Sequence, residues 1–292
     1  MNALPQIMVT GLTLGAQYAV ATLGLSLIWA SLRFLNLAHG AMLAVGGYAA
    51  FAVATNFGLS GPLAFLATMV FGALIGWAIF WGLVRPILDT RDFETNILIV
   101  TIGLSIILEN GLLQIFGGQP YGQPVSVQGA FALAGIHFPV QNMVIVLSAI
   151  TIVLAVSVLL RWTRIGLALR ASAQDRDAAA LMGLPVTALF SATMALAGAL
   201  TAASGVMVSS ITQLSPLLGD DPMLKAFIMC VLAGLGNIGG AIASAFLLAI
   251  VEVMAEYYVG ERWGFPTLLF LVIAVLIWKP NGLFSGREVQ RL

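Results

Sequence analysis

Charged side chains are scarce in this sequence of 292 residues, in which 12 Lys and Arg residues are balanced by 12 Asp and Glu residues. They make up 8 % of the chain, against roughly 25 % in a soluble domain. So few charges cannot cover a soluble globule of this size, and without a basic excess nucleic acid is excluded as a partner. Because hydrophobic residues make up 60 %, the composition predicts a multi-pass protein in a lipid bilayer.

Reactive and metal-binding residues are also few. Cys230 is the single cysteine, which excludes a disulfide scaffold, and two histidines are too few for a zinc site. No G-x-x-x-x-G-K-[ST] phosphate loop, H-E-x-x-H or G-x-S-x-G motif is present. The first 32 residues have no charged side chain, so the basic segment of a signal peptide is missing. We expect no enzyme, no catalytic residues, no metal and no cofactor.

Long apolar runs indicate the fold. A membrane-spanning helix needs about 20 apolar residues, whereas barrel strands would alternate polar and apolar residues. The runs therefore predict an all-α, polytopic inner-membrane bundle with about eight embedded helical segments. The apolar stretch 223–236 is too short for a secure crossing and is interpreted as a half-helix that enters from one side. The expected spans are 7–29, 38–57, 62–84, 95–116, 140–160, 188–210, 238–258 and 265–279.

The distribution of Lys and Arg predicts the orientation. Ten of the twelve fall on one side of this layout, and Lys225 and Arg262 fall on the other. Because cytoplasmic connections carry the excess of positive charge, we expect the N-terminus outside, the C-terminus inside, and either seven or nine crossings. The ten are Arg33, Arg85, Arg91, Arg161, Arg164, Arg170, Arg176, Lys279, Arg287 and Arg291.

The connections between the spans are too short for a catalytic domain, so 1–292 is expected to be a single transmembrane domain. The long connection on the inner side is 161–187, and the long one on the outer, periplasmic side is 117–139. Within the latter, 125–127 and 131–133 can form a small hairpin around 128–130.

Three glutamates, Glu109, Glu252 and Glu256, lie toward the outer ends of their expected spans. Glu252 and Glu256 are one helical turn apart and share a helix face. We interpret these carboxylates as lining a solvated outer vestibule or a polar helix end, and a proton relay is the alternative.

The inner connection 161–187 has six charges between Arg161 and Asp177. Asp175 or Asp177 is suited to begin a short helix, whose free N–H groups favour an anion. Gly183 is suited to the left-handed position that ends such a helix. A small apolar face is expected on Ala178, Leu181 and Met182, at i, i+3 and i+4 spacing.

Two interpretations of this short helix are open. It can lie on the membrane surface, although it has no Trp or Phe to anchor it there. It can also dock into a groove of another protein. The residues expected to make the second contact are Asp175, Arg176, Asp177, Ala178, Ala179, Leu181, Met182 and Gly183.

Asp177–Ala178–Ala179 followed by Gly183 resembles the E-A-A…G coupling motif of ATP-binding-cassette (ABC) importer permeases, with Asp in place of Glu. Three further stretches are similar to branched-chain amino acid permeases of the smaller, LIV type. The segment from Phe34 to Tyr48 resembles their N-F-A-x-G…G-A-Y motif, and Leu232 to Ala241 resembles their glycine-rich turn. Trp278 to Phe284 resembles their R-P-x-G-L-F tail.

This resemblance implies a permease subunit that imports branched-chain or other hydrophobic amino acids. The implied partners are a second permease subunit, two ATPase subunits and a periplasmic amino-acid-binding protein. The alternative from another class is an autonomous channel or secondary carrier for a small polar solute such as urea or an amide. The ATP would be hydrolysed by the partner subunits, because this chain has no phosphate loop.

Two polar positions with neighbouring glycines are candidates for the translocation path. Asn36 and His39 are three residues apart and can either cap a helix at the cytoplasmic interface or line the inner part of the path. Gly236 and Asn237 belong to a run of glycines that breaks a helix, and transporters use such breaks to present backbone groups to a solute. Close packing is the alternative at Asn237. Gly11–x–x–x–Gly15 and Gly72–x–x–x–Gly76 are assigned to helix packing only.

Overall fold

Apolar segments become helices here because only a helix or a closed barrel satisfies every backbone N–H and C=O group within lipid. The computed structural model describes residues 3–133 and 136–284, and eight helices in these ranges are long and apolar enough to cross a membrane. The predicted helical bundle and its eight spans are confirmed. The membrane-length helices are α1 (Ala3–Leu32), α2 (His39–Phe57), α3 (Gly61–Ile79), α5 (Phe93–Phe116), α6 (Val140–Trp162), α9 (Val186–Ser209), α11 (Ile238–Tyr258) and α12 (Gly264–Trp278).

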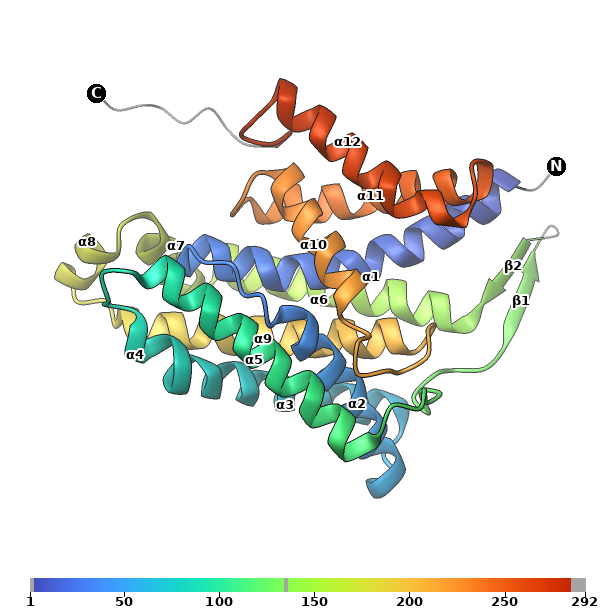
Figure 1. Cartoon of the computed structure of the whole chain (residues 1–292), viewed down its shortest axis with the longest axis horizontal. Coiled ribbons are helices and arrows are strands. Elements are labelled where there is room, and N and C mark those ends of the chain that lie inside the picture. Colours follow the sequence, from blue (N-terminus) through green and yellow to red (C-terminus); the bar gives the residue numbers. More distant parts are fainter. Residues whose placement is uncertain (1–2, 134–135, 285–292) are drawn as a thin grey trace.

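Shorter elements connect these helices. A π-helical turn, Phe80–Val84, and α4 (Arg85–Ile87) continue α3, and a 3₁₀ turn, Glu261–Trp263, precedes α12. The helices α7 (Arg164–Gln174) and α8 (Arg176–Leu181) project at one end of the bundle, called here the loop end (Figure 1). The strands β1 (Ala130–Leu133) and β2 (Ile136–Pro139) project at the opposite end, called here the hairpin end.

The predicted half-helix is present as α10 (Asp220–Ala233), which runs obliquely to the other helices in Figure 1. The chain turns back at Ser210, after α9, and Gly219 meets Gly40 before α10 begins. After α10, Gly236 lies beside Trp29 and Ala30 near the loop end of α1. The stretch from Ser210 to Ala233 therefore leads from one end of the bundle to the other. With it, residues 3–133 and 136–284 pass through the bundle nine times, eight times as membrane-length helices and once as this stretch.

Helices α1 and α9 form the centre of the bundle and are buried along most of their length. Helices α6, α10 and α11 pack on α1, and α2 and α3 pack on α9. Small residues allow these close approaches, as predicted for both glycine pairs. A Cβ on Gly72 would lie 2.5 Å from the carbonyl oxygen of Gly198, and one on Gly15 would lie 2.6 Å from the Phe246 ring. Such contacts hold helices together where lipid removes the hydrophobic driving force between them.

The hairpin differs from the expected one. Strand β1 pairs antiparallel with β2, so that Ala130 lies opposite Pro139 and Leu133 opposite Ile136, and the 125–127 segment is not a strand. The Val127 N–H donates instead to Gln141 Oε1, at 2.7 Å. Positions 134–135 lie outside the described residues. A connection this short favours pairing of the strands directly next to it.

Helix α7 was not predicted, whereas α8 was. Thr163 begins α7, because its Oγ1 accepts a hydrogen bond from the Gly166 N–H at 3.1 Å. Thr163 was itself the signal in the sequence, because Thr is a preferred N-cap residue. With α7 present, the connection 161–187 is two short helices between α6 and α9 (Figure 1).

Candidate functional site

Helices α2 and α10 both begin inside the bundle rather than at one of its ends. A Cβ on Gly40 would lie 2.7 Å from the carbonyl oxygen of Gly219, so the two backbones meet directly. At neighbouring positions His39 Nε2 lies 3.1 Å from the carbonyl oxygen of Ala21, well inside α1. Because Ala21 is eleven residues before Leu32, this contact lies about 16 Å from that helix end. Two helix starts are therefore placed deep in the bundle.

A buried ion pair links α10 to the rest of the chain. Lys225 Nζ lies 2.6 Å from Glu252 Oε1 of α11 and 2.6 Å from Asp221 Oδ2 of its own helix. Lys225 Nζ also donates to the Tyr18 hydroxyl at 3.1 Å, close to the midpoint of α1. The Glu252 side chain is 2 % exposed, and its Oε2 has no partner within the described ranges. The Glu252 carboxylate is tolerated at this depth because it is paired with the Lys225 ammonium, while Asp221 remains exposed.

This geometry corrects two expectations. Lys225 is not on an outer surface, because it is nine-tenths buried between α1, α10 and α11. Glu252 is not in a solvated vestibule either, whereas Glu256 one turn further is only half-buried. The sequence signal was present in the spacing of Asp221 and Lys225, which are four residues apart on the expected half-helix.

A cleft of about 450 Å³ separates the start of α10 from α5. The carboxylates of Glu109 and Asp220 line it, and Ser105 Oγ donates to Glu109 Oε1 at 2.7 Å. Ionisable groups at membrane depth face protein or water rather than lipid. The cleft therefore marks a face of this chain that is unsuited to lipid. The other lining residues are Leu37, Ile102, Ile106, Met223 and Leu224.

Asn36 and His39 are completely inside the chain, at 1 % and 0 % exposure. The Asn36 Oδ1 atom accepts from the Ala38 N–H at 3.1 Å, and His39 Nδ1 lies 3.2 Å from Thr201 Oγ1 of α9. Their depth contradicts a cap at the membrane interface. His39 thus holds the start of α2 against α1 and α9. Asn36 bonds locally, because its Nδ2 donates to the Met42 sulfur of α2 at 3.7 Å.

Gly236 and Asn237 lie far from that pair, at the loop end. Gly236 has φ 88°, a left-handed conformation that favours glycine. Asn237 caps α11, since its Oδ1 accepts from the Gly240 N–H at 3.0 Å. Its Nδ2 donates to the Phe284 carbonyl oxygen at 2.6 Å and so fixes the segment that follows α12. The structure thus does not bring the four expected path residues together.

Helix α8 has the predicted ends. Asp175 is its N-cap, because Oδ1 accepts from the Ala178 N–H at 2.9 Å. Gly183 has φ 82°, and the Gly183 and Leu184 N–H groups donate to the carbonyl oxygens of Ala180 and Ala179 at 3.0 and 3.1 Å. This pair of bonds is a Schellman motif, which requires a left-handed residue after the helix.

The sides of α8 have opposite environments. Leu181 and Met182 are 90 % and 83 % exposed, and Ala178 next to them is exposed too. Ala179 is 5 % exposed and packs in a core cluster with residues that include Val186 and Phe190. Ala179 therefore helps attach α8 to the rest of this chain, and this corrects its expected place on the docking face. The outward apolar face consists of Ala178, Leu181 and Met182.

Arg176 and Asp89 fix α8 to the connection between α4 and α5. Arg176 Nη2 lies 2.7 Å from Asp89 Oδ1, and the guanidinium lies over the Phe190 ring at 5.8 Å. The hydrogen bond from Arg176 lowers the pKa of the Asp89 carboxyl below its usual value. The Asp177 side chain on the same helix remains exposed. Asp89 was not singled out from the sequence, because its partner is 87 residues away.

A bundle of this size, with a half-helix, a buried ion pair and a short exposed helix at one end, defines a multi-pass membrane protein. The family described as branched-chain amino acid transport system / permease component matches residues 7–278, so the chain belongs to that family. It is therefore a permease component located in the inner membrane.

Individual relatives match over nearly the whole chain. The high-affinity branched-chain amino acid transport system permease protein LivH of Escherichia coli (strain K12) is 27 % identical, over 98 % of this chain and 97 % of its own. The corresponding protein BraD of Pseudomonas aeruginosa is 26 % identical with the same coverage. A probable branched-chain amino acid transport permease protein LivH of Methanocaldococcus jannaschii is 28 % identical, over 92 % and 89 % of the two chains. The similarity thus extends over almost the whole length of each of these relatives.

Proposed function

We propose that this chain is one permease subunit of an ABC importer that moves branched-chain or other hydrophobic amino acids into the cytoplasm. The family and the names of the relatives support this substrate class. The partners would be a second permease subunit, two ATPase subunits and a periplasmic amino-acid-binding protein. The loop end would then be cytoplasmic, and the hairpin end periplasmic.

The exposed apolar face of α8 is the observation that carries the proposal. Leu181 and Met182 are almost fully exposed on a helix whose two ends are fixed by Asp175 and Gly183. A rigid helix with a small apolar face fits a groove on another protein. We infer that an ATPase subunit supplies this groove, and that its movement is passed through α7 and α9 to the bundle.

The solute path would run along the cleft between α5 and α10. The carboxylates of Glu109 and Asp220 are suited to the ammonium group of an amino acid, and the apolar lining is suited to its side chain. The cleft is open, so a second permease subunit would close it. That Asn36, His39, Gly236 and Asn237 line the path stays a prediction.

The same substitution on opposite sides of α8 tests the docking face. Ala178→Glu puts a charge on the apolar face, whereas Ala180→Glu puts one on an exposed position on the other side of the helix. An unpaired charge in a protein groove is costly. We expect Ala178→Glu to abolish co-purification of the ATPase and ATP-driven uptake in proteoliposomes, and Ala180→Glu to retain both.

The opposite result would count against the proposal. If Ala178→Glu assembled with the ATPase and transported like the unchanged protein, α8 would not be the coupling element. Uptake of urea, an amide or another small solute by the chain without ATPase subunits would favour the autonomous channel or carrier instead.

A further inference from the structure

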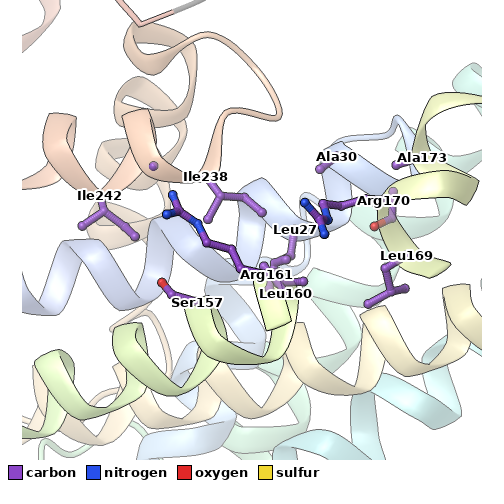
Figure 2. Close-up of a pocket in the computed structure, with 12 residues that line it drawn as sticks. Leu27, Ala30, Ser157, Leu160, Arg161, Leu169, Arg170, Ala173, Ile238 and Ile242 are labelled. Atoms are coloured by element: carbon purple, nitrogen blue, oxygen red, sulfur yellow. The ribbon is translucent and has the colours of Figure 1, made fainter. Parts of the chain in front are cut away.

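A second pocket, of about 200 Å³, lies at the loop end between α1, α6, α7 and α11 (Figure 2). It is separate from the α5–α10 cleft and from the exposed face of α8. Arg161 extends from α6 toward Ile238 and Ile242 of α11, and Arg170 extends from α7 toward Leu27 of α1, as Figure 2 shows. Two guanidinium groups from different helices therefore line one pocket, and Figure 2 shows them apart from each other, one beside Ile238 and the other beside Leu27.

These guanidinium groups have no carboxylate partner in the described part of the chain. Helix α1 contains no charged residue, and the acidic residues of α11, Glu252 and Glu256, are at least 14 residues beyond Ile238. Gly239 in the first turn of α11 also lines the pocket, where the helix dipole favours an anion. Arg161 and Arg170 are the charged residues among those that line the pocket, so the pocket favours an anion.

Apart from Ser31 and Ser157, the rest of the lining is apolar and continues toward the membrane interior. Leu27, Leu160 and Ile242 come from three membrane-length helices. Arg161 is next to the last residue of α6, and Trp162, which ends the helix, is 84 % exposed. Arg and Trp at the end of a span are typical of the headgroup level of a bilayer. The pocket thus combines two cations at headgroup level with apolar surface below them.

We propose that this pocket binds an anionic phospholipid, with its phosphate on Arg161 and Arg170 and an acyl chain along Leu27 and Ile242. Guanidinium groups bind phosphate oxygens in a bidentate manner, and basic pockets between membrane helices bind anionic headgroups. The bound lipid joins α7 to α1, α6 and α11. Because α7 leads through Asp175 into α8, lipid occupancy sets how firmly α8 is attached to the bundle.

Lipid binding is measured on the purified full chain, without ATPase or transport, so this result is independent of the proposed function. The protein in detergent is titrated with phosphatidylglycerol, with phosphatidylcholine and with inorganic phosphate, and bound lipid is counted by native mass spectrometry. We expect phosphatidylglycerol to bind in preference to phosphatidylcholine. Replacing Arg161 or Arg170 by Gln should weaken its binding by about fivefold each.

Arg164→Gln is the matched control, because Arg164 is on α7 but does not line the pocket. It should bind phosphatidylglycerol like the unchanged protein. Arg161→Lys with Arg170→Lys keeps both charges and should retain more binding than the two Gln substitutions. Because Arg161 and Arg170 are exposed, their substitution should not disturb the fold. Circular dichroism checks that every variant is folded.

Three results would overturn the proposal. Equal binding by the Gln double variant and the unchanged protein would show that the arginines do not hold the lipid. Equal binding of phosphatidylcholine would remove the role of anionic charge. Saturation by inorganic phosphate that phosphatidylglycerol cannot displace would assign the pocket to a soluble anion.

Discussion

Lys225 Nζ of α10 and Glu252 Oε1 of α11 lie 2.6 Å apart, and both side chains are buried. Their ion pair fixes the half-helix at the depth where the Tyr18 hydroxyl also contacts the Lys225 ammonium. Because transporters use broken helices at the solute site, we expect the position of α10 to matter for transport. The pair is therefore a structural anchor beside the α5–α10 cleft.

Removing one member of this pair should destabilise the protein more than removing both. Lys225→Met should lower the stability by about 3 kcal/mol, because it leaves the buried Glu252 carboxylate without its partner. Glu252→Leu should cost less, because Lys225 keeps its ion pair with Asp221. The double variant should be more stable than either single variant, as measured by thermal unfolding in detergent. Glu256→Gln, one turn further on α11, is the control, and equal melting temperatures for all variants would show that the pair is not an anchor.

The end of α8 should depend on the left-handed conformation of Gly183. A β-branched residue at φ 82° is strained, so Gly183→Val should cost about 1–2 kcal/mol locally and misdirect the chain into α9. Asn tolerates the left-handed conformation, so Gly183→Asn is the control. We expect substrate-stimulated ATP hydrolysis in the assembled transporter to fall for Val and to persist for Asn. Full hydrolysis by the Val variant would contradict a rigid α8.

Orientation is testable by cysteine labelling after Cys230→Ala. Leu181→Cys at the loop end and Ser60→Cys near the start of α3 are both exposed. Ser172, although it is in the same loop, is buried and unsuitable for labelling. An impermeant reagent added from the periplasmic side should label Cys at position 60 only. Labelling of position 181 from that side would reverse the topology.

Charge removal in the α5–α10 cleft should slow transport without affecting assembly. We expect Glu109→Gln and Asp220→Asn each to reduce uptake by roughly tenfold, because each removes a carboxylate available to the substrate ammonium. Glu94→Gln, in the first turn of α5 and outside the cleft, is the control. Uptake assays with the complete transporter measure this effect. Unchanged uptake in both cleft variants would place the path elsewhere.

The attachment of α8 should be insensitive to pH near neutrality. Arg176 lowers the pKa of Asp89. The contribution of the Arg176–Asp89 pair to stability is therefore fully present above the ordinary Asp pKa of about 3.9, and it is lost as pH falls through the lowered value. Asp89→Asn should remove the contact at pH 7, at a cost of at most about 1 kcal/mol for an exposed pair. Hydrogen exchange of the α8 amides measures this loosening, with Asp92→Asn as the control. Identical exchange of the α8 amides in the Asp89→Asn and Asp92→Asn variants would show that the pair does not attach α8.

Local sequence patterns determined the helices of this protein and the ends of α8. Hydropathy is a property of each segment, and a span must satisfy its own backbone, so eight spans and the half-helix could be predicted without knowing their neighbours. Asp175 and Gly183 act on N–H and C=O groups within a few residues, and their roles were predictable for the same reason. The family motifs near Phe34, Leu232 and Trp278 were equally visible in the sequence.

Only the tertiary structure decided which polar residues are buried and which face outward. The Lys225–Glu252 pair joins residues 27 positions apart, and His39 contacts Thr201 across 162 positions, so no local pattern reports either contact. Ala179 and Ala178 have the same chemistry in sequence, and only the packing of α8 against α9 separates the buried residue from the exposed one. The cleft at Glu109 and the pocket at Arg161 likewise exist because distant helices meet, which hydropathy along the chain does not specify.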